Sequence, residues 1–169
     1  NKGLEGVIIE KKEYHLKIKF NFSNKQLLKY LNLYGSLPIP PYIKKNNNED
    51  INKMNYQTIF AKKPGAFAAP TASLHFDLNL LNKIKKSKIK IIYTTLHVGA
   101  GTFLPLKNSE VNKNKIHKEY GCISANAAKE INDAINKKKN IVAVGTTVLR
   151  LLEDCYKKYG EIKKFNENT

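Results

Sequence analysis

The chain has 169 residues, 41% of them hydrophobic, and 30 Lys and Arg against 14 Asp and Glu give a formal net charge of +16. This size and composition suit a folded core, which excludes wholesale disorder and a collagen-like fibre. No apolar run approaches the roughly 18 residues that cross a bilayer, so we expect a cytoplasmic, monomeric protein without a membrane partner.

Residues 1–35 predict a small β unit closed by a helix. Apolar and polar residues alternate from Val7 to Phe22, which is the period of half-buried strands. Ser23 stands three residues before Gln26 and ahead of several leucines, a capping box that begins a helix. Gly35 can end that helix. We expect this part to be the end of a small antiparallel β-barrel-like subdomain.

From Pro38 the composition changes, and residues 36–169 are predicted to form a separate α/β domain that binds cofactor and substrate. Prolines make the start of this part stiff and extended, and Asp50 can cap a short helix after a polar run. The segment from Lys62 to Phe76 is rich in proline, glycine and alanine. A long apolar loop of this kind is often functional.

Helices and strands alternate after this loop. Asp77 is a suitable N-cap for a helix, and residues 89–96 form a largely apolar strand. Ser124 begins an alanine-rich helix, residues 141–144 form a second apolar strand, and a last helix runs to Gly160. The alternation predicts an α/β fold with a mostly parallel sheet flanked by helices.

Ligands collect at the carboxyl ends of strands in such sheets, and residues 96–103 lie at one of these ends. Gly99 and Gly101 would let a ligand approach the backbone, whose N–H groups, with the Thr102 hydroxyl, can bind an anionic group. Leu104 replaces the last glycine of a dinucleotide fingerprint, so a tight structural turn is an equally good interpretation.

A second loop of this kind begins the last helix. Gly145, Thr146 and Thr147 offer hydroxyls and free N–H groups that can hold a carboxylate, a ribose or a phosphate. Arg150 follows one turn later and is the only arginine in a lysine-rich chain, which suggests a bidentate contact that lysine cannot make. An ion pair with Glu153 is the alternative.

Three histidines, His75, His97 and His117, lie in loops or at strand ends, and Glu119 follows the last of them. A lone histidine is more often a hydrogen-bonded structural residue than a catalyst. Neither the histidines nor the two cysteines have the spacing of metal ligands, so we expect no metal. The positive charge is weak support for a nucleic-acid partner, because an A/T-rich genome also produces many lysines.

The chain resembles the S-adenosylmethionine:tRNA ribosyltransferase-isomerase family of queuosine biosynthesis from about Leu27 to its end. The resemblance rests on five motifs in the same order: PIPPYI (38–43), YQTIFAKKPGAFAAPTASLHF (56–76), LHVGAGTFLPL (96–106), IHKEY (116–120) and VGTTVLRLLE (144–153). Ser73 stands where the family motif has glycine, which would strain the backbone if that position needs a positive φ.

This resemblance implies an enzyme that uses S-adenosylmethionine as co-substrate and needs no metal. The ribosyl group would pass to the aminomethyl arm of 7-aminomethyl-7-deazaguanine at the wobble position of tRNA, giving epoxyqueuosine and releasing adenine and methionine. Such chemistry needs a base for the proton beside the sulfonium and help for the departing adenine.

Within these motifs, roles are assigned by the chemical type of each residue. The acid and base are expected among His75, His97, His117 and Glu119. The cofactor is expected to bind Gly99, Gly101, Thr102, Gly145, Thr146, Thr147 and Arg150. The substrate base or tRNA is expected to contact Tyr42, Tyr56, Gln57 and Thr71.

Two other functions stay open. Family members extend beyond this chain at both ends, so we expect a central fragment, and a fragment could be a basic RNA-binding module without catalysis. That module would bind tRNA with strong salt dependence and turn nothing over. An ordinary methyltransferase would release S-adenosylhomocysteine and no adenine, and the five motifs argue against it.

Overall fold

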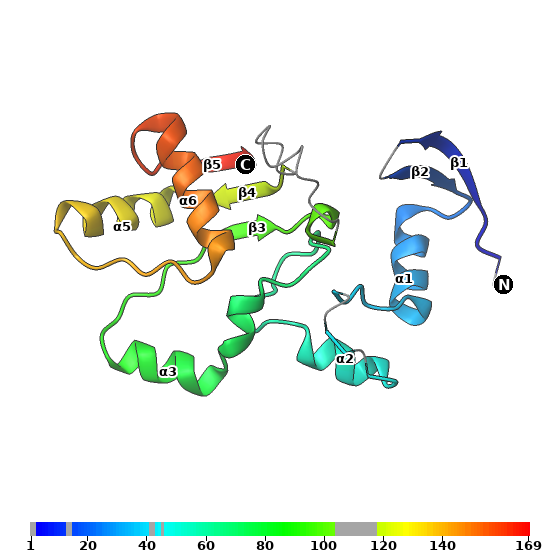
Figure 1. The fold of residues 1–169 in the computed structure, drawn as a ribbon, viewed down its shortest axis with the longest axis horizontal. Coiled ribbons are helices and arrows are strands. Elements are labelled where there is room, and N and C mark those ends of the chain that lie inside the picture. Colours follow the sequence, from blue (N-terminus) through cyan, green and yellow to red (C-terminus); the bar gives the residue numbers. More distant parts are fainter. Residues whose placement is uncertain (1–2, 13–14, 41–42, 45, 104–117) are drawn as a thin grey trace. The chain divides into compact units, whose positions relative to one another are not determined.

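The computed structural model describes residues 3–12, 15–40, 43–44, 46–103 and 118–169. Two predicted site residues, Tyr42 and His117, lie outside them. The chain divides into two compact units, Asn1–Leu37 and Pro38–Thr169, whose elements are shown in Figure 1. The domains predicted over 1–35 and 36–169, with the roles given to them, stay predictions.

The first unit is a hairpin followed by a helix. Strands β1 (Gly6–Lys11) and β2 (Leu16–Phe20) pair antiparallel, and α1 spans Asn24–Tyr34. The Ser23 side chain accepts from the Gln26 backbone N–H, and the Gln26 side chain accepts from the Ser23 N–H, so the predicted capping box is confirmed. That the hairpin ends a barrel-like subdomain stays a prediction.

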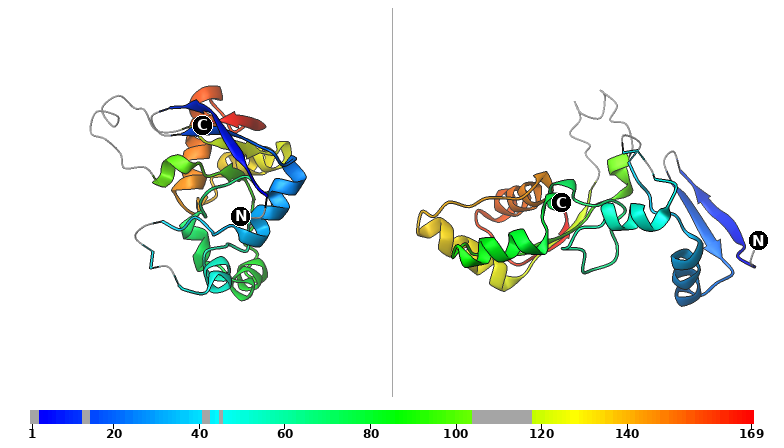
Figure 2. Two further views of the ribbon diagram at one scale, coloured as in Figure 1. Left: turned by 90° about the vertical axis from the view of Figure 1, so that its right-hand side faces the viewer. Right: turned by 90° about the horizontal axis from the view of Figure 1, so that it is seen from below.

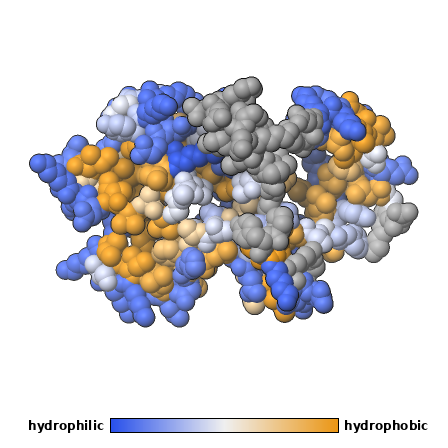
Figure 3. Space-filling view, viewed as in Figure 1, coloured by the Kyte–Doolittle hydropathy of each residue, from blue (hydrophilic) through white to orange (hydrophobic). Residues whose placement is uncertain are grey.

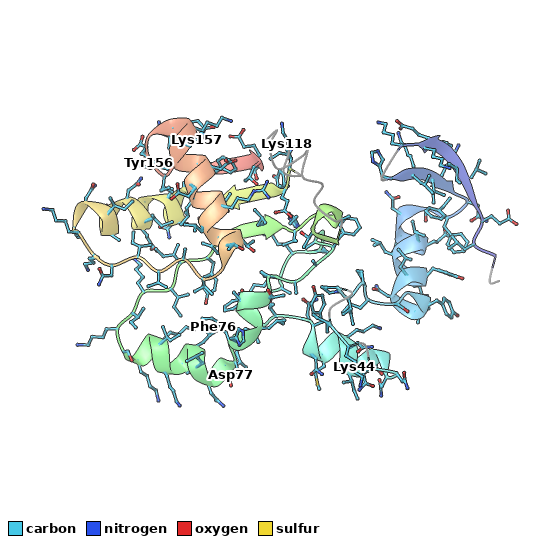
Figure 4. All side chains as sticks on the ribbon, in the orientation of Figure 1. Lys44, Phe76, Asp77, Lys118, Tyr156 and Lys157 are labelled. Carbon is cyan, nitrogen blue, oxygen red and sulfur yellow. The ribbon has the colours of Figure 1, made fainter. Side chains whose placement is uncertain are left out.

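The helices of the second unit begin at polar caps, apart from the last, which begins at Gly145. They are α2 (Glu49–Asn55), α3 (Leu78–Lys86), α5 (Ala125–Asn136) and α6 (Thr146–Tyr159), with short 3₁₀ turns η1 (Thr71–His75) and η2 (Ala100–Phe103). Asp77, labelled in Figure 4, caps α3, and Ser124 caps α5, both as predicted. The cap of α2 is Asn48 and not Asp50, because the Asn48 side chain accepts from the first N–H groups of the turn.

Strands β3 (Thr95–His97), β4 (Tyr120–Ile123) and β5 (Phe165–Asn168) form a three-stranded sheet in the order β3-β4-β5. Both pairs are antiparallel, so the mostly parallel sheet is not found among the described strands. Residues 89–94 and 141–144 were expected as strands and have no regular secondary structure. Apolar β-branched residues favour a strand, but a strand forms only where another backbone pairs with it. The parallel α/β class stays a prediction.

The core of this unit lies between the sheet and the last two helices, which both views in Figure 2 place beside the sheet. Ile123 of β4, Phe165 of β5, and Leu151 and Cys155 of α6 are fully buried. Gly121 of β4 lets α6 approach, since a Cβ there would lie 2.4 Å from Leu151 Cδ1. No helix in the described ranges is long and apolar enough to span a membrane.

Candidate functional site

A pocket of about 280 Å³ lies in the second unit, between the residues after β3, the loop before α3 and the N-terminus of α6. Seven of its lining residues belong to the predicted site: Tyr56, Thr71, Thr102, Glu119, Thr146, Thr147 and Arg150. The other walls are small and apolar: Pro40, Ala68, Ala69, Pro70 and Val98. A small apolar cavity with a few converging polar groups is typical of a ligand site.

Glu119 connects three parts of the pocket wall. Its Oε1 accepts from the Gly99 backbone N–H at 2.9 Å, and its Oε2 accepts from Arg150 Nη1 at 3.3 Å. Its backbone carbonyl accepts from the N–H of Thr169 at 2.8 Å and from that residue's hydroxyl at 3.1 Å. The Glu119 side chain is only 11% exposed, so these contacts take place largely away from water. The carboxylate therefore holds the loop after β3 against α6.

Arg150 projects from the second turn of α6 and contacts both Glu119 and Thr169. One guanidinium nitrogen donates to Glu119, and Nη2 donates to the Thr169 backbone oxygen at 2.9 Å. The side chain is 30% exposed and lines the pocket. A planar guanidinium can serve both acceptors at once, whereas a lysine ammonium has a single nitrogen. The structure pairs Arg150 with Glu119, a partner that the sequence did not single out.

The N-terminus of α6 forms another wall. Gly145 caps this helix with φ +86 and has no side chain to occupy the first N–H groups. A Cβ at Gly145 would lie 3.0 Å from Ala72 Cβ, so glycine is required by both its φ and its neighbour. Thr146 and Thr147 follow and line the pocket. Open N–H groups beside two hydroxyls suit an anionic or hydroxylated ligand.

His97 lies at the end of β3 but is not among the lining residues. Its ring stands 5.8 Å from that of Tyr120, centroid to centroid. Gly65 has φ +133, and a Cβ there would lie 2.8 Å from His97 Nδ1. The loop is fixed to the strand end by the Phe67 N–H, which donates to the Val98 carbonyl at 2.8 Å. This loop therefore lies against His97, whose side chain is half-buried.

The structure separates the other predicted residues into two groups. Gly99, Gly101 and Gly145 adjoin lining residues, while Gln57 is exposed outside the lining and His75 is exposed at the end of η1. The catalytic, cofactor and substrate roles of all these residues stay predictions.

Sequence reasoning did not find Thr169, whose backbone contacts both Glu119 and Arg150. It is 50 residues from the first and 19 from the second, and no motif connects positions that far apart.

The backbone strain that the sequence suggested at Ser73 is not found, because Ser73 has no positive φ. The serine that replaces the motif glycine is buried in η1 without backbone strain.

In the described part of the chain, no group of three or more His, Cys, Asp or Glu side chains is placed to hold a metal ion. The polar groups of the pocket are one guanidinium, one carboxylate, a phenol and threonine hydroxyls. This donor set suits an organic ligand with a carboxylate and hydroxyls.

Curated proteins with similar sequences share one printed name, S-adenosylmethionine:tRNA ribosyltransferase-isomerase. The relative from Rickettsia bellii is 43% identical over 148 residues, which are 87% of this chain and 42% of the relative. Those from Roseobacter denitrificans and Caulobacter vibrioides are 45% and 40% identical, over 90% and 98% of this chain and 43% and 46% of their own lengths. The chain thus spans less than half the length of these relatives.

The family model described as "Queuosine biosynthesis protein" matches residues 4–169, nearly the whole chain. The pocket residues Glu119, Thr146, Thr147 and Arg150 all lie within that match. The chain therefore belongs to the family of queuosine biosynthesis proteins.

Proposed function

We propose that this chain carries the cofactor pocket of an S-adenosylmethionine:tRNA ribosyltransferase-isomerase. The reaction transfers the ribosyl group of S-adenosylmethionine to the aminomethyl group of 7-aminomethyl-7-deazaguanine at the tRNA wobble position. Adenine and methionine are released, and the product is epoxyqueuosine in tRNA. Cytoplasmic location and a monomeric state are part of the same proposal.

The observation that carries the proposal is the convergence of four motifs on one pocket. Tyr56 and Thr71 come from the second motif, Thr102 from the third, Glu119 from the fourth, and Arg150 from the fifth. These positions are up to 94 residues apart in sequence (56 and 150). Residues of four separate motifs that meet in one cavity are more simply explained by a shared ligand than by separate structural coincidences.

The chemistry of the pocket fits S-adenosylmethionine. Arg150 is the cation that would attract the carboxylate of its methionine part, and the guanidinium is already oriented by Glu119. Thr146 and Thr147 at the open helix start would bind carboxylate or ribose hydroxyls. The cavity of about 280 Å³ is near the lower end of the range for ligand pockets, about 300–1,000 Å³.

The proposal is tested by mass spectrometry of the small molecules released from S-adenosylmethionine. The chain is mixed with the cofactor and an anticodon stem-loop that carries 7-aminomethyl-7-deazaguanine, and the full-length Roseobacter denitrificans relative is assayed in parallel. We expect adenine and methionine only when the modified RNA is present. Release of S-adenosylhomocysteine would indicate methyl transfer and refute the proposal.

A non-catalytic RNA-binding part is the second candidate, and the net charge of +16 favours it. It predicts stem-loop binding that falls steeply with salt, together with no release of adenine by this chain. If the full-length relative turns over and this chain only binds RNA, the second candidate is correct for the chain alone.

Arg150→Lys tests the cofactor contact directly. One ammonium cannot keep both the Glu119 and the Thr169 contacts and also bind a carboxylate, so we expect the dissociation constant for S-adenosylmethionine to rise about tenfold or more. Calorimetric titration measures it, and circular dichroism checks the fold. An unchanged dissociation constant would return Arg150 to a purely structural role.

His97→Ala tests the acid and base assignment. If His97 is catalytic, adenine release stops while stem-loop binding is nearly unchanged, because one imidazole outside the pocket lining adds little to phosphate contact. Tyr120→Phe is the matched control, since it keeps the ring beside His97 and removes only the hydroxyl that donates to Asn166. Unchanged turnover in His97→Ala would remove this histidine from the candidates.

A further inference from the structure

Residues 89–94 and 141–144, here called the unpaired segments, have the composition of strands but no partner. In the part of the chain that the structure describes, none of their backbone N–H or C=O groups is hydrogen-bonded to another backbone group. Figure 1 shows them as coil that leads into β3 and into the start of α6. Each such residue carries one strong donor and one strong acceptor that protein backbones normally satisfy.

Four large apolar side chains of the unpaired segments are strongly exposed. The exposed fractions are 58% for Ile89, 51% for Tyr93, 45% for Ile141 and 83% for Val142. On the face shown in Figure 3, apolar surface gathers over the region between α5 and α3. Ile92 packs partly against the core, so the first segment is anchored there and not free to turn away from this surface.

The unpaired segments carry a single charged residue, Lys90, whose ammonium lies 3.0 Å from Glu130 of α5. Residues 91–96 and 141–149 contain no Lys, Arg, Asp or Glu, whereas the whole chain has 30 Lys and Arg. Strand edges that face solvent are usually protected by lysine, proline or a bulge, because a bare edge pairs with other chains. Beyond Lys90 the unpaired segments have no such protection, and an unprotected apolar edge is a surface that becomes covered.

We propose that the unpaired segments bind an apolar β-strand from the part of the longer family protein that this chain does not span. The curated relatives are more than twice as long as the stretch they share with this chain, which leaves more than half of their sequence to supply that strand. A second copy of this chain is the alternative occupant. The proposal rests on family membership and on unpaired backbone, and it goes beyond ribosyl transfer.

Pairing at these segments would also fix the pocket. The first segment continues through β3 to Val98, and the second continues through Gly145 to Thr146. Val98 and Thr146 both line the candidate site. A strand bound along both segments would therefore hold two walls of the pocket in place, as paired strands position loops at their carboxyl ends.

Hydrogen exchange read by mass spectrometry tests the proposal without an activity assay. In this chain alone, amides of 89–94 and 141–144 should exchange nearly as fast as unstructured amides, while those of β4 are protected. In the full-length Roseobacter denitrificans relative, the matching stretches should be protected at least about 100-fold more. Fast exchange of those stretches in the relative, or protection already present in the monomeric chain, would overturn the proposal.

A lysine substitution separates pairing from general stability. Val142→Lys in this chain should leave its urea midpoint unchanged, because the side chain is 83% exposed. Lysine at the matching position of the full-length relative should accelerate exchange there at least about tenfold, because a charge would be buried. Met54→Lys, 74% exposed on α2, is the matched control and should change neither protein.

Light scattering after size exclusion decides between the two occupants. Protection that appears in this chain only together with a dimer mass would assign the unpaired segments to a second copy and refute the proposed strand. None of these measurements needs turnover, so failure of this proposal leaves the proposed function standing, and failure of ribosyl transfer leaves this proposal testable.

Discussion

Removal of the Glu119–Arg150 pair should lower the free energy of unfolding. The size of the loss depends on how deeply the two side chains are buried and not on the distance between them. The two side chains are 3.3 Å apart and are 11% and 30% exposed. Buried hydrogen bonds to charged groups contribute about 1.5–3 kcal/mol, and exposed ion pairs typically contribute about 0.2–1 kcal/mol. Because Arg150 is partly in solvent, we expect a coupling free energy of about 1–2 kcal/mol.

A double-mutant cycle measures this coupling. Glu119→Gln keeps an oxygen for the Gly99 N–H but removes the charge, and Arg150→Met keeps the apolar stem without the guanidinium. Urea unfolding followed by circular dichroism gives the free energy of unfolding of each single variant and of the double variant. The coupling is the part of the double-variant effect that the two single effects do not explain.

The surface pair of Lys163 and Glu161 is the control for this cycle. Its atoms are closer, at 3.1 Å, but its side chains are 53% and 55% exposed. The same cycle there should give a coupling below about 0.5 kcal/mol. A coupling at Glu119 and Arg150 no larger than the control value would refute the reasoning that this pair holds the pocket wall together.

Two further predictions concern the sheet that carries the site. Gly121→Ala should lower the free energy of unfolding by about 1–3 kcal/mol, because the new Cβ would lie 2.4 Å from Leu151 Cδ1. Gly99→Ala is its control in urea unfolding, since a Cβ there meets nothing closer than 3.8 Å, and equal stability of the two variants would contradict the packing argument. At the sheet edge, the hydrogen bond from Lys158 lowers the pKa of Glu167. A carboxyl whose pKa is lower in the folded state stabilises the fold above its unfolded pKa, and that contribution is lost as pH falls through the folded pKa. Between pH 7 and pH 3, the melting temperature of the Glu167→Gln variant should therefore fall less than that of the unaltered chain. An equal fall would exclude this carboxyl as a source of acid sensitivity.

The sequence alone determined those features that a few neighbouring residues control. Ser23, Asp77 and Ser124 each offer a side-chain oxygen to N–H groups two or three positions ahead, so three helix starts follow from local chemistry. The hairpin of the first unit follows from alternation in the same way. Family membership was also readable, because the motifs are contiguous strings that need no knowledge of how the chain folds.

Tertiary structure decided what depends on residues far apart in the chain. Glu119 was a candidate, but only folding shows that its carboxylate connects Gly99 with Arg150 and that Thr169 completes the contact. His97 was a candidate too, and only folding shows that the loop at Gly65 lies against it and that it does not line the pocket. Strand pairing also depends on residues far apart in the chain. Residues 141–144 have the composition of a strand but no regular secondary structure, because a strand needs hydrogen bonds from a second backbone that the local sequence does not specify.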